Sequence, residues 1–260
     1  SSSSRGLGDV YKRQIIDSSA DLNDAAEKIM QSKCFDNATS CSSENSITIQ
    51  ESVYDEAIHA LKRVGGYLCS EEDKKKILAN LWVNGRLNRY LLAKDPEIFA
   101  DLCELPTDAK KAKFFMVEDS GTGPEKPLSG EKLSLALTVY RVPDIDAAIC
   151  QVQDILNYQG MGHSVGIHTK SVKNAQQLAE RLDVVRVLVN QAHTFGNGGS
   201  FDNGLGFTLT MGCGTWAGNS ISENLGHHHF INVTHLVETI PEDKPSEEEL
   251  FGAHWAKYGK

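Results

Sequence analysis

Strands and helices alternate in the second half of the chain, and this alternation is the strongest constraint on the fold. Apolar runs typical of buried strands occupy residues 133–142, 164–168 and 185–190. Between them, residues 144–159 and 171–183 carry apolar side chains at helical spacing. Two successive parallel strands need a crossover connection, which a helix provides. The order β-α-β-α-β therefore predicts an α/β fold with a parallel sheet.

The first half of the chain shows the same kinds of element, although they are shorter. Ser18 and Asp21 have the spacing of a capping box, and Ser52 is placed to cap the following helix. From periodicity we expect helices over 18–33, 53–64, 71–81 and 86–93, and strands over 46–50 and 114–118.

Composition excludes several classes of partner. The chain has 35 acidic against 26 basic residues and a formal net charge of −9, so it lacks the basic face that nucleic acid requires. No apolar run approaches the roughly 20 residues that span a membrane, and no secretory leader is visible. Six scattered cysteines without a C-x-x-C pair indicate reduced thiols and a cytoplasmic protein.

Both ends of the chain differ from the middle. Residues 1–14, SSSSRGLGDVYKRQ, have no apolar face and resemble translated adapter sequence, so we expect an assembly artefact outside the fold. On this interpretation the chain is truncated upstream and begins near Ile15, in mid-domain. Residues 227–238 alternate like a strand, and residues 240–260 form a polar tail.

The stretch Gly162-His-Ser-Val-Gly166 matches the G-x-S-x-G motif of serine hydrolases. That motif needs a strand before it and a helix after it, so that the turn exposes the serine. Here the order is reversed, because helix 144–159 precedes Ser164 and strand 164–168 follows it. We therefore expect a helix-to-strand turn, and a hydrolase that uses Ser164 is only a remote alternative.

Neither a dinucleotide motif nor a metal site is evident. A G-x-G-x-x-G motif would require glycine where Val165 and Ala217 stand. Of the three histidines at 227–229, only the first and third share a face of a strand, and no cysteine or carboxylate lies at ligand spacing. We expect no metal.

Cys41 is the best candidate nucleophile. It lies in FDNATSCSSENS, between a predicted helix and a predicted strand, among small polar residues. A nucleophilic thiolate needs access and nearby amide donors, and small neighbours permit both. The alternative is an ordinary thiol in a non-catalytic α/β binding module.

Three stretches together resemble the aldehyde dehydrogenase superfamily, in particular its CoA-acylating branch. FDNATSCSSE resembles the pattern F-D-N-G-x-x-C-x-S-E around the catalytic cysteine of that branch, so that Cys41 falls on the nucleophile and Ala38 departs from glycine. PLSGEKLSLALTVYRV places Glu131 on the glutamate that holds the nicotinamide ribose and Leu133 on its apolar neighbour. GCGTWAGNSISEN resembles the glycine-rich turn near the C-terminus, and the resemblance spans residues 15 to about 238.

This resemblance implies a fold and an activity. Residues 15–225 would form the parallel-sheet catalytic domain, with the coenzyme-binding Rossmann domain largely missing, so that the chain alone would be nearly inactive. Residues 226–239 would be the strand that pairs between subunits of a homodimer or homotetramer. An aldehyde would be oxidised by NAD or NADP through a thioester on Cys41, which coenzyme A then receives.

The resemblance also suggests a substrate and further contacts. The loop 191–207 most resembles that of the sulfoacetaldehyde dehydrogenases and would line the pocket for a small aldehyde. His163 lies where the branch tends to carry a G-H-[ST] turn. The candidate contacts to coenzyme A or substrate are His163, His193 and Thr194. A non-acylating aldehyde dehydrogenase stays open, because the glutamate that activates water would precede residue 15.

Overall fold

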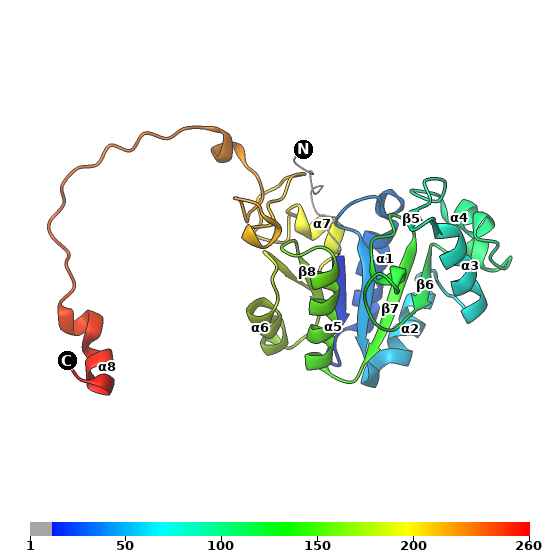
Figure 1. Cartoon of the computed structure of the whole chain (residues 1–260), viewed down its shortest axis with the longest axis horizontal. Helices are drawn as coiled ribbons and strands as arrows, with labels where there is room; N and C mark the ends of the chain where they lie inside the picture. Colours follow the sequence, from blue (N-terminus) through cyan, green and yellow to red (C-terminus); the bar gives the residue numbers. More distant parts are fainter. Residues whose placement is uncertain (1–11) are drawn as a thin grey trace. The chain divides into compact units, whose positions relative to one another are not determined.

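Seven parallel strands form the central sheet, which confirms the α/β fold predicted from the alternation (Figure 1). The computed structural model describes residues 12–260, and residues 1–11 lie outside the described part. Neighbouring strands follow the order β3-β6-β7-β2-β1-β8-β9, and every pair is parallel. The strands are β1 (Lys12–Ile16), β2 (Glu44–Gln50), β3 (Gly66–Leu68), β6 (Phe114–Glu118), β7 (Ala136–Val142), β8 (Val165–His168) and β9 (Val187–Val189).

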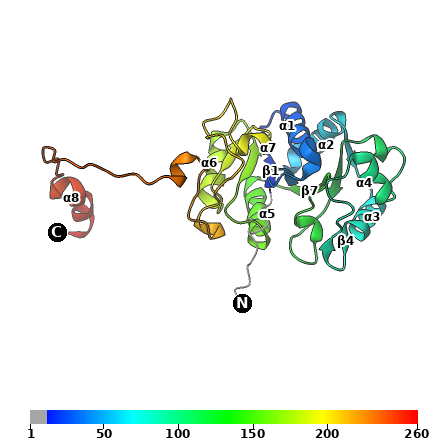
Figure 2. The same ribbon diagram turned by 90° about the horizontal axis from the view of Figure 1, so that it is seen from above.

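Helices cover both faces of this sheet. Figure 2 shows α1 (Leu22–Cys34) and α2 (Tyr54–Arg63) on one face and α5 (Ile145–Tyr158) on the other, where α6 (Val172–Arg181) shares its core. Side chains of a strand alternate between faces, so Ile16 packs in the α1 layer and Ile15 in the α5 layer. The α1 layer continues through α3 (Glu71–Leu81) and α4 (Pro96–Leu102). None of the described helices is long and apolar enough to cross a bilayer.

The helix starts differ from the predicted caps. The N-cap of α1 is Asp21, whose carboxylate accepts from the amides of Asn23 and Asp24, so the predicted capping box with Ser18 does not form. Ser52 lies in a 3₁₀ turn, and α2 begins without a side-chain cap. An aspartate satisfies two first-turn donors directly, which makes a cap at Ser18 unnecessary.

The helix predicted over residues 86–93 is wrong. A two-stranded hairpin, β4 (Trp82–Val83) and β5 (Arg86–Leu87), occupies the start of this range. Its turn is Asn84-Gly85, with φ of 53° and 72°. An Asn-Gly pair with two positive φ angles suits a tight hairpin, and this local preference overrides the apolar spacing.

The expectation that residues 1–14 lie outside the fold is wrong for residues 12–14, which form part of β1 between β2 and β8. Arg13 and Gln14 are buried. The Arg13 guanidinium donates to the carbonyls of Ile155 (3.0 Å) and Gln159 (2.6 Å). Polar side chains that are satisfied by long-range hydrogen bonds hide this strand from a search for apolar patterns.

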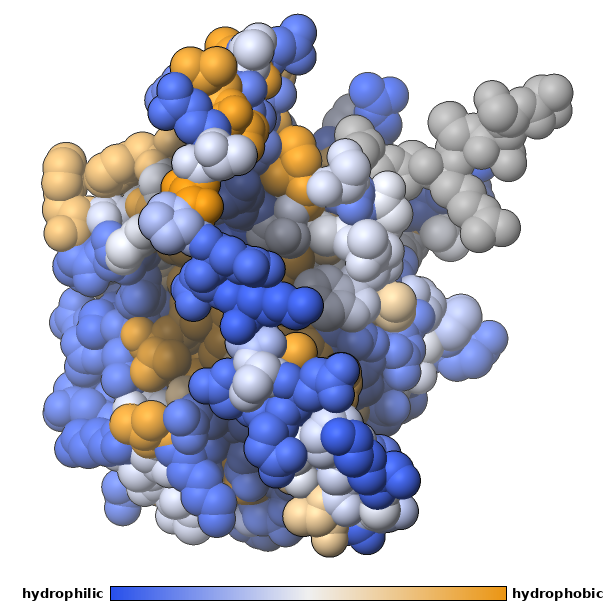
Figure 3. All heavy atoms as spheres, turned by 90° about the vertical axis from the view of Figure 1, so that its left-hand side faces the viewer, coloured by the Kyte–Doolittle hydropathy of each residue, from blue (hydrophilic) through white to orange (hydrophobic). Residues whose placement is uncertain are grey.

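The chain divides into two units, one ending at Gly226 and the other spanning His227–Lys260. The second unit has a 3₁₀ turn (His227–Phe230), exposed residues 231–246 without regular structure, and α8 (Glu247–Tyr258). Residues 226–239 therefore form no strand within this single chain, and the predicted pairing between subunits, which would supply a partner for the peptide groups, stays a prediction. The apolar residues of this segment are exposed. Exposed hydrophobic side chains among hydrophilic ones can be seen on the face of the molecule drawn in Figure 3.

Candidate active site

Three of the candidate segments meet at the amino edge of the sheet. Cys41 precedes β2, Glu131 precedes β7 and His163 precedes β8, and these strands lie close together in the order β7-β2-β1-β8. Because parallel strands begin at one edge, segments far apart in the sequence converge there. Ligands of most open α/β sheets bind at the opposite, carboxyl edge.

The turn that presents Cys41 joins α1 to β2. Asp36, Asn37 and Ala38 have φ of 50°, 47° and 62°, so the chain is left-handed over three residues. The Thr39 hydroxyl donates to the Asp36 carbonyl (2.7 Å) and steadies this bend. Alanine at position 38, where glycine would fit without strain, costs about 1 kcal/mol.

Cys41 itself is exposed at the tip of this turn. The amides of its neighbours are occupied, because Ser42 N donates to Ser40 Oγ (3.2 Å) and Ser43 N to the Ser40 carbonyl (2.9 Å). Within residues 12–260, the Cys41 amide donates to no protein group. It is therefore a donor available for an oxyanion formed at the thiol.

A cavity of about 490 Å³ opens beside the thiol. One wall comes from the Cys41 turn and the other from residues 194–211, which follow β9 and include most of α7 (His193–Asn197). The lining residues are Phe35, Ser40, Cys41, Ser42, Thr194, Phe195, Gly198, Gly199, Phe207, Thr208, Leu209 and Met211. The loop 191–207, which was predicted to line a pocket, contributes several of these residues. None of the lining residues is charged.

Thr194 is held in the cavity wall by α1. Its amide donates to Ser32 Oγ (2.8 Å), and its hydroxyl donates to the Ser32 carbonyl (3.1 Å). The two hydroxyl oxygens are also 2.8 Å apart. These contacts fix the short helix α7, which has too few residues to be stable alone.

A buried chain of polar groups lies behind the cavity. Ser164 Oγ is 2.7 Å from His163 Nδ1 and 2.9 Å from His193 Nε2. Asn197 Nδ2 is 3.4 Å from His163 Nδ1 and donates to Ser42 Oγ (3.1 Å). All of these residues are at most 3 % exposed. This series of hydrogen bonds connects both histidines to Ser42, the residue that follows Cys41.

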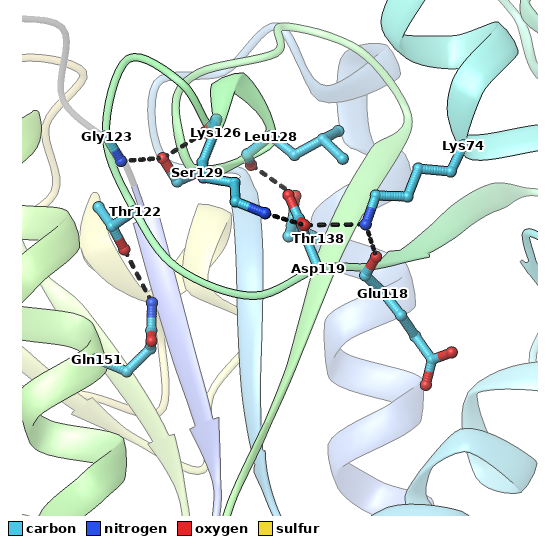
Figure 4. Close-up of polar contacts among 10 residues, drawn as sticks. All are labelled: Lys74, Glu118, Asp119, Thr122, Gly123, Lys126, Leu128, Ser129, Thr138 and Gln151. Carbon is cyan, nitrogen blue, oxygen red and sulfur yellow. Dashed lines mark hydrogen bonds and ion pairs between the residues drawn. The ribbon is translucent and has the colours of Figure 1, made fainter. Parts of the chain in front are cut away.

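Glu131 lines a different cavity, of about 570 Å³, together with Trp82, Gly130, Tyr158 and Gln159 among others. The loop before Glu131 is braced from several sides. Figure 4 shows Asp119 between Lys74 (2.9 Å) and Lys126 (3.7 Å), and Thr138 Oγ1 donating to the Leu128 carbonyl (2.7 Å). Residues 119–130 therefore hold Glu131 in one place.

The segments of Glu131 and Cys41 are linked through Lys132. Its amide donates to Asn45 Oδ1 (3.1 Å), four residues after Cys41, and its buried ammonium donates to the carbonyls of Leu128 (2.7 Å) and Gly130 (2.8 Å). Burial keeps the pKa of Lys132 well below its usual range. Cys41 and Glu131 line different cavities, and the hydrogen bonds of Lys132 link the two segments that carry them.

Comparison with known proteins agrees with this arrangement. No family model matches the chain. A sulfoacetaldehyde dehydrogenase (acylating) from Cupriavidus necator is 44% identical over 98% of this chain, and a sulfoacetaldehyde dehydrogenase from Acholeplasma sp is 38% identical over 95%. The crystal structure of an acetylating aldehyde dehydrogenase from Geobacillus thermoglucosidasius superposes with a TM-score of 0.83, at 33% identity over 92% of this chain. The chain belongs to the CoA-acylating branch of the aldehyde dehydrogenase superfamily.

The chain spans about half the length of its relatives, 52% of both dehydrogenases and 53% of the solved structure. Thr194 lines the cavity of Cys41, and its contact with substrate or coenzyme A stays a prediction. His163 and His193 lie behind that cavity instead. Leu133 is half-buried with a φ of 42°, and its carbonyl accepts from the Ala93 amide (3.1 Å).

Sequence reasoning missed the buried charges beneath the Cys41 turn. Lys33 Nζ donates to the Glu44 carbonyl (2.8 Å), and Gln14 Nε2 donates to the Glu44 carboxylate (2.6 Å). Burial lowers the pKa of Lys33 to about 7 and raises the pKa of Glu44 to about 7. One sequence signal existed, because Lys33 falls four residues after Ile29 on the apolar stripe of α1.

Proposed function

We propose that this chain supplies the catalytic part of an NAD- or NADP-dependent, CoA-acylating aldehyde dehydrogenase in which Cys41 is the nucleophile. One observation carries the proposal: Cys41 is exposed in a cavity and has an available amide donor at its own backbone. An aldehyde that enters this cavity can meet the thiolate and the amide together.

The chemistry proceeds in two halves. The Cys41 thiolate adds to the aldehyde carbon, and the carbonyl oxygen becomes an alkoxide that the Cys41 amide stabilises. Oxidised nicotinamide supplies the hydride acceptor when bound, and the carbon on Cys41 then becomes a thioester. The thiolate of coenzyme A attacks this thioester, the bond to Cys41 breaks, and acyl-CoA and the Cys41 thiolate are released.

The residues before β7 fit a nicotinamide cofactor. Glu131 presents a carboxylate in a cavity of about 570 Å³, where ribose hydroxyls can donate to it. Leu133 would be the apolar neighbour of the nicotinamide. These roles follow the resemblance of the segment and the shape of the cavity, and they do not distinguish NAD from NADP.

We propose a small aldehyde such as sulfoacetaldehyde as substrate, because both sequence relatives are named for it. The hydroxyls of Thr194 and Thr208 line the cavity, and each would have to turn away from the backbone carbonyl to which it donates, Ser32 or Thr210, in order to donate to a sulfonate. Thr194 is the proposed direct contact, whereas buried His163 and His193 would act through their neighbours. The six free cysteines fit a reducing compartment such as the cytoplasm, and pairing into dimers or tetramers stays a proposal.

The test uses a chimaera of this chain with the part of the Cupriavidus necator relative that the chain does not cover. Sulfoacetaldehyde, acetaldehyde and succinate semialdehyde are assayed with each nicotinamide, with and without coenzyme A. We expect CoA-dependent turnover and a thioester on the Cys41 peptide by mass spectrometry when coenzyme A is withheld. Cys41→Ser should lower turnover by roughly 10³-fold or more.

Cys150→Ser is the matched control, because Cys150 is also exposed but lies on α5 away from either cavity. It should leave turnover unchanged. Free acid formed without coenzyme A would favour the non-acylating alternative. Full turnover of the Cys41→Ser chimaera, or a thioester elsewhere, would overturn the proposal.

A further inference from the structure

Asn197 stands at the junction of the cavity and the buried polar chain. It ends α7 and is 0% exposed. Its Nδ2 contacts Ser42 Oγ (3.1 Å) and His163 Nδ1 (3.4 Å), while its backbone carbonyl accepts from Asn224 Nδ2 (3.2 Å). Asn197 therefore connects its own loop, 191–207, to the Cys41 turn and to the turn before β8.

For neutral imidazole rings, the chemistry of these atoms gives the direction of the hydrogen bonds that join Asn197, His163, Ser164 and His193. An amide nitrogen can only donate, so Asn197 Nδ2 presents a donor to His163 Nδ1 at 3.4 Å and shares the single lone pair of that nitrogen with the closer Ser164 hydroxyl. Ser164 Oγ, 2.7 Å from the same Nδ1, must then give its hydroxyl hydrogen to it. Ser164 Oγ in turn accepts from His193 Nε2, 2.9 Å away. Both neutral rings consequently carry their proton on Nε2.

The orientation of the amide is itself determined by burial. With Nδ2 toward Ser42 and His163, Oδ1 is a buried acceptor without a partner in the described residues. The reversed orientation would leave the two N–H donors of Nδ2 unpaired instead. Unpaired buried donors are rarer in proteins than under-satisfied carbonyl oxygens, so the observed orientation is favoured.

We propose that Asn197 is a positioning residue of the active site, which anchors the Cys41 turn through Ser42 and fixes the His163 ring as the neutral Nε2–H tautomer. A second proton on Nδ1 would face the amide donor, so Asn197 also opposes protonation of the ring. The link to catalysis rests on the proposed function, whereas the tautomer does not.

The test compares Asn197→Asp with Asn219→Asp. A carboxylate at position 197 can only accept, so His163 must then donate from Nδ1. At position 219 the side chain accepts from the Cys213 amide (2.9 Å), and aspartate keeps that role while losing one long, exposed hydrogen bond to the Ala217 carbonyl (3.4 Å). Nitrogen NMR of the 260-residue chain should show a proton on Nδ1 of His163 and a rise of its pKa by about one to two units only in Asn197→Asp.

Turnover of the chimaera provides the second readout. We expect kcat to fall about tenfold in Asn197→Asp with little change in KM, and its pH profile to follow His163. Ser42→Ala should lower kcat while leaving the tautomer unchanged. If Asn197→Asp does not fold, Asn197→Ala should give a mixture of both tautomers.

Two results would overturn the inference. A proton already on Nδ1 in the unmodified chain would mean that the amide oxygen faces the ring. An Asn197→Asp variant that keeps the Nε2–H tautomer, like the Asn219→Asp control, would mean that Asn197 does not fix it. An inactive chimaera with the expected spectra would instead contradict the proposed function alone.

Discussion

His168 is a buried histidine whose lowered pKa should make the stability of the fold depend on pH. It lies at the end of β8, is 1% exposed, and neither ring nitrogen has a hydrogen-bond partner in the described residues. Burial lowers its pKa from 6.5 to about 4; Asp24 opposes this shift and Lys28 adds to it. Between these two values the unfolded chain binds a proton that the folded chain does not bind, so acid destabilises the fold.

We expect His168 to remove about 3 kcal/mol of stability as the pH falls from 6.5 to 4. Glu44 has the opposite effect, because its folded pKa of about 7 lies above its ordinary 4.5. A single denaturation profile would therefore mix the two groups. His168→Leu, which is neutral at every pH, isolates the histidine.

The measurement is the difference in unfolding free energy between His168→Leu and the unmodified chain, from urea denaturation at several pH values. It should grow in favour of the variant by about 1.4 kcal/mol per pH unit between pH 6 and 4.5. His59→Leu, on the exposed face of α2, is the control variant, because it removes a histidine and keeps the buried His168. An equal slope in both variants would contradict the assignment to His168.

At the scale of elements, α7 depends on α1 for its position. Ser32→Ala would leave the amide and hydroxyl of Thr194 without their buried side-chain partner. We expect a loss of about 1–3 kcal/mol in unfolding free energy and faster hydrogen exchange of the α7 amides. Ser52→Ala, in an exposed 3₁₀ turn, should stay within about 0.5 kcal/mol of the unmodified chain. Equal effects of both changes would show that α7 is held by other contacts.

Elements with strong apolar periodicity were predictable from the sequence. Elements that depend on hydrogen bonds to distant segments or on a partner strand were not. α3 begins and ends at the predicted residues, 71–81, and α5 lies within one residue of its predicted bounds. β1 was missed because its buried Arg13 and Gln14 depend on hydrogen bonds to distant segments. Residues 226–239 form no strand in this single chain, where no partner strand lies beside them, and their pairing between subunits stays a prediction.

In the candidate site, too, local sequence pointed to some residues, whereas others are defined by contacts between distant segments. Cys41 and Thr194 were candidates from local sequence and resemblance, and they line the same cavity. Asn197 was not identifiable, because its importance comes from contacts with Ser42 and His163, which are 155 and 34 residues away. Pairings over such separations depend on the strand order of the sheet, which no local pattern contains.

At the scale of the whole molecule, the two units differ in what stabilises them. The first unit has extensive buried cores on both faces of a seven-stranded sheet. The second has no buried side chain among its described residues, and residues 231–246 are exposed without regular structure. Exposed segments of this kind are where proteases cut first, because cleavage needs an extended backbone.

We therefore expect a glutamate-specific protease to cut first after Glu238 or Glu242, and to release α8 before any cut in the first unit. Glu180 provides the internal comparison, since it is exposed but lies within α6 and must unfold locally to be cleaved. Mass spectrometry of a time course identifies the order of the cuts. The product that ends near residue 240 should unfold within a few degrees of the intact chain, since the cores that determine its melting temperature are untouched. Early cleavage at Glu180, or a large fall in melting temperature after the first cut, would show that the first unit depends on the second for its stability.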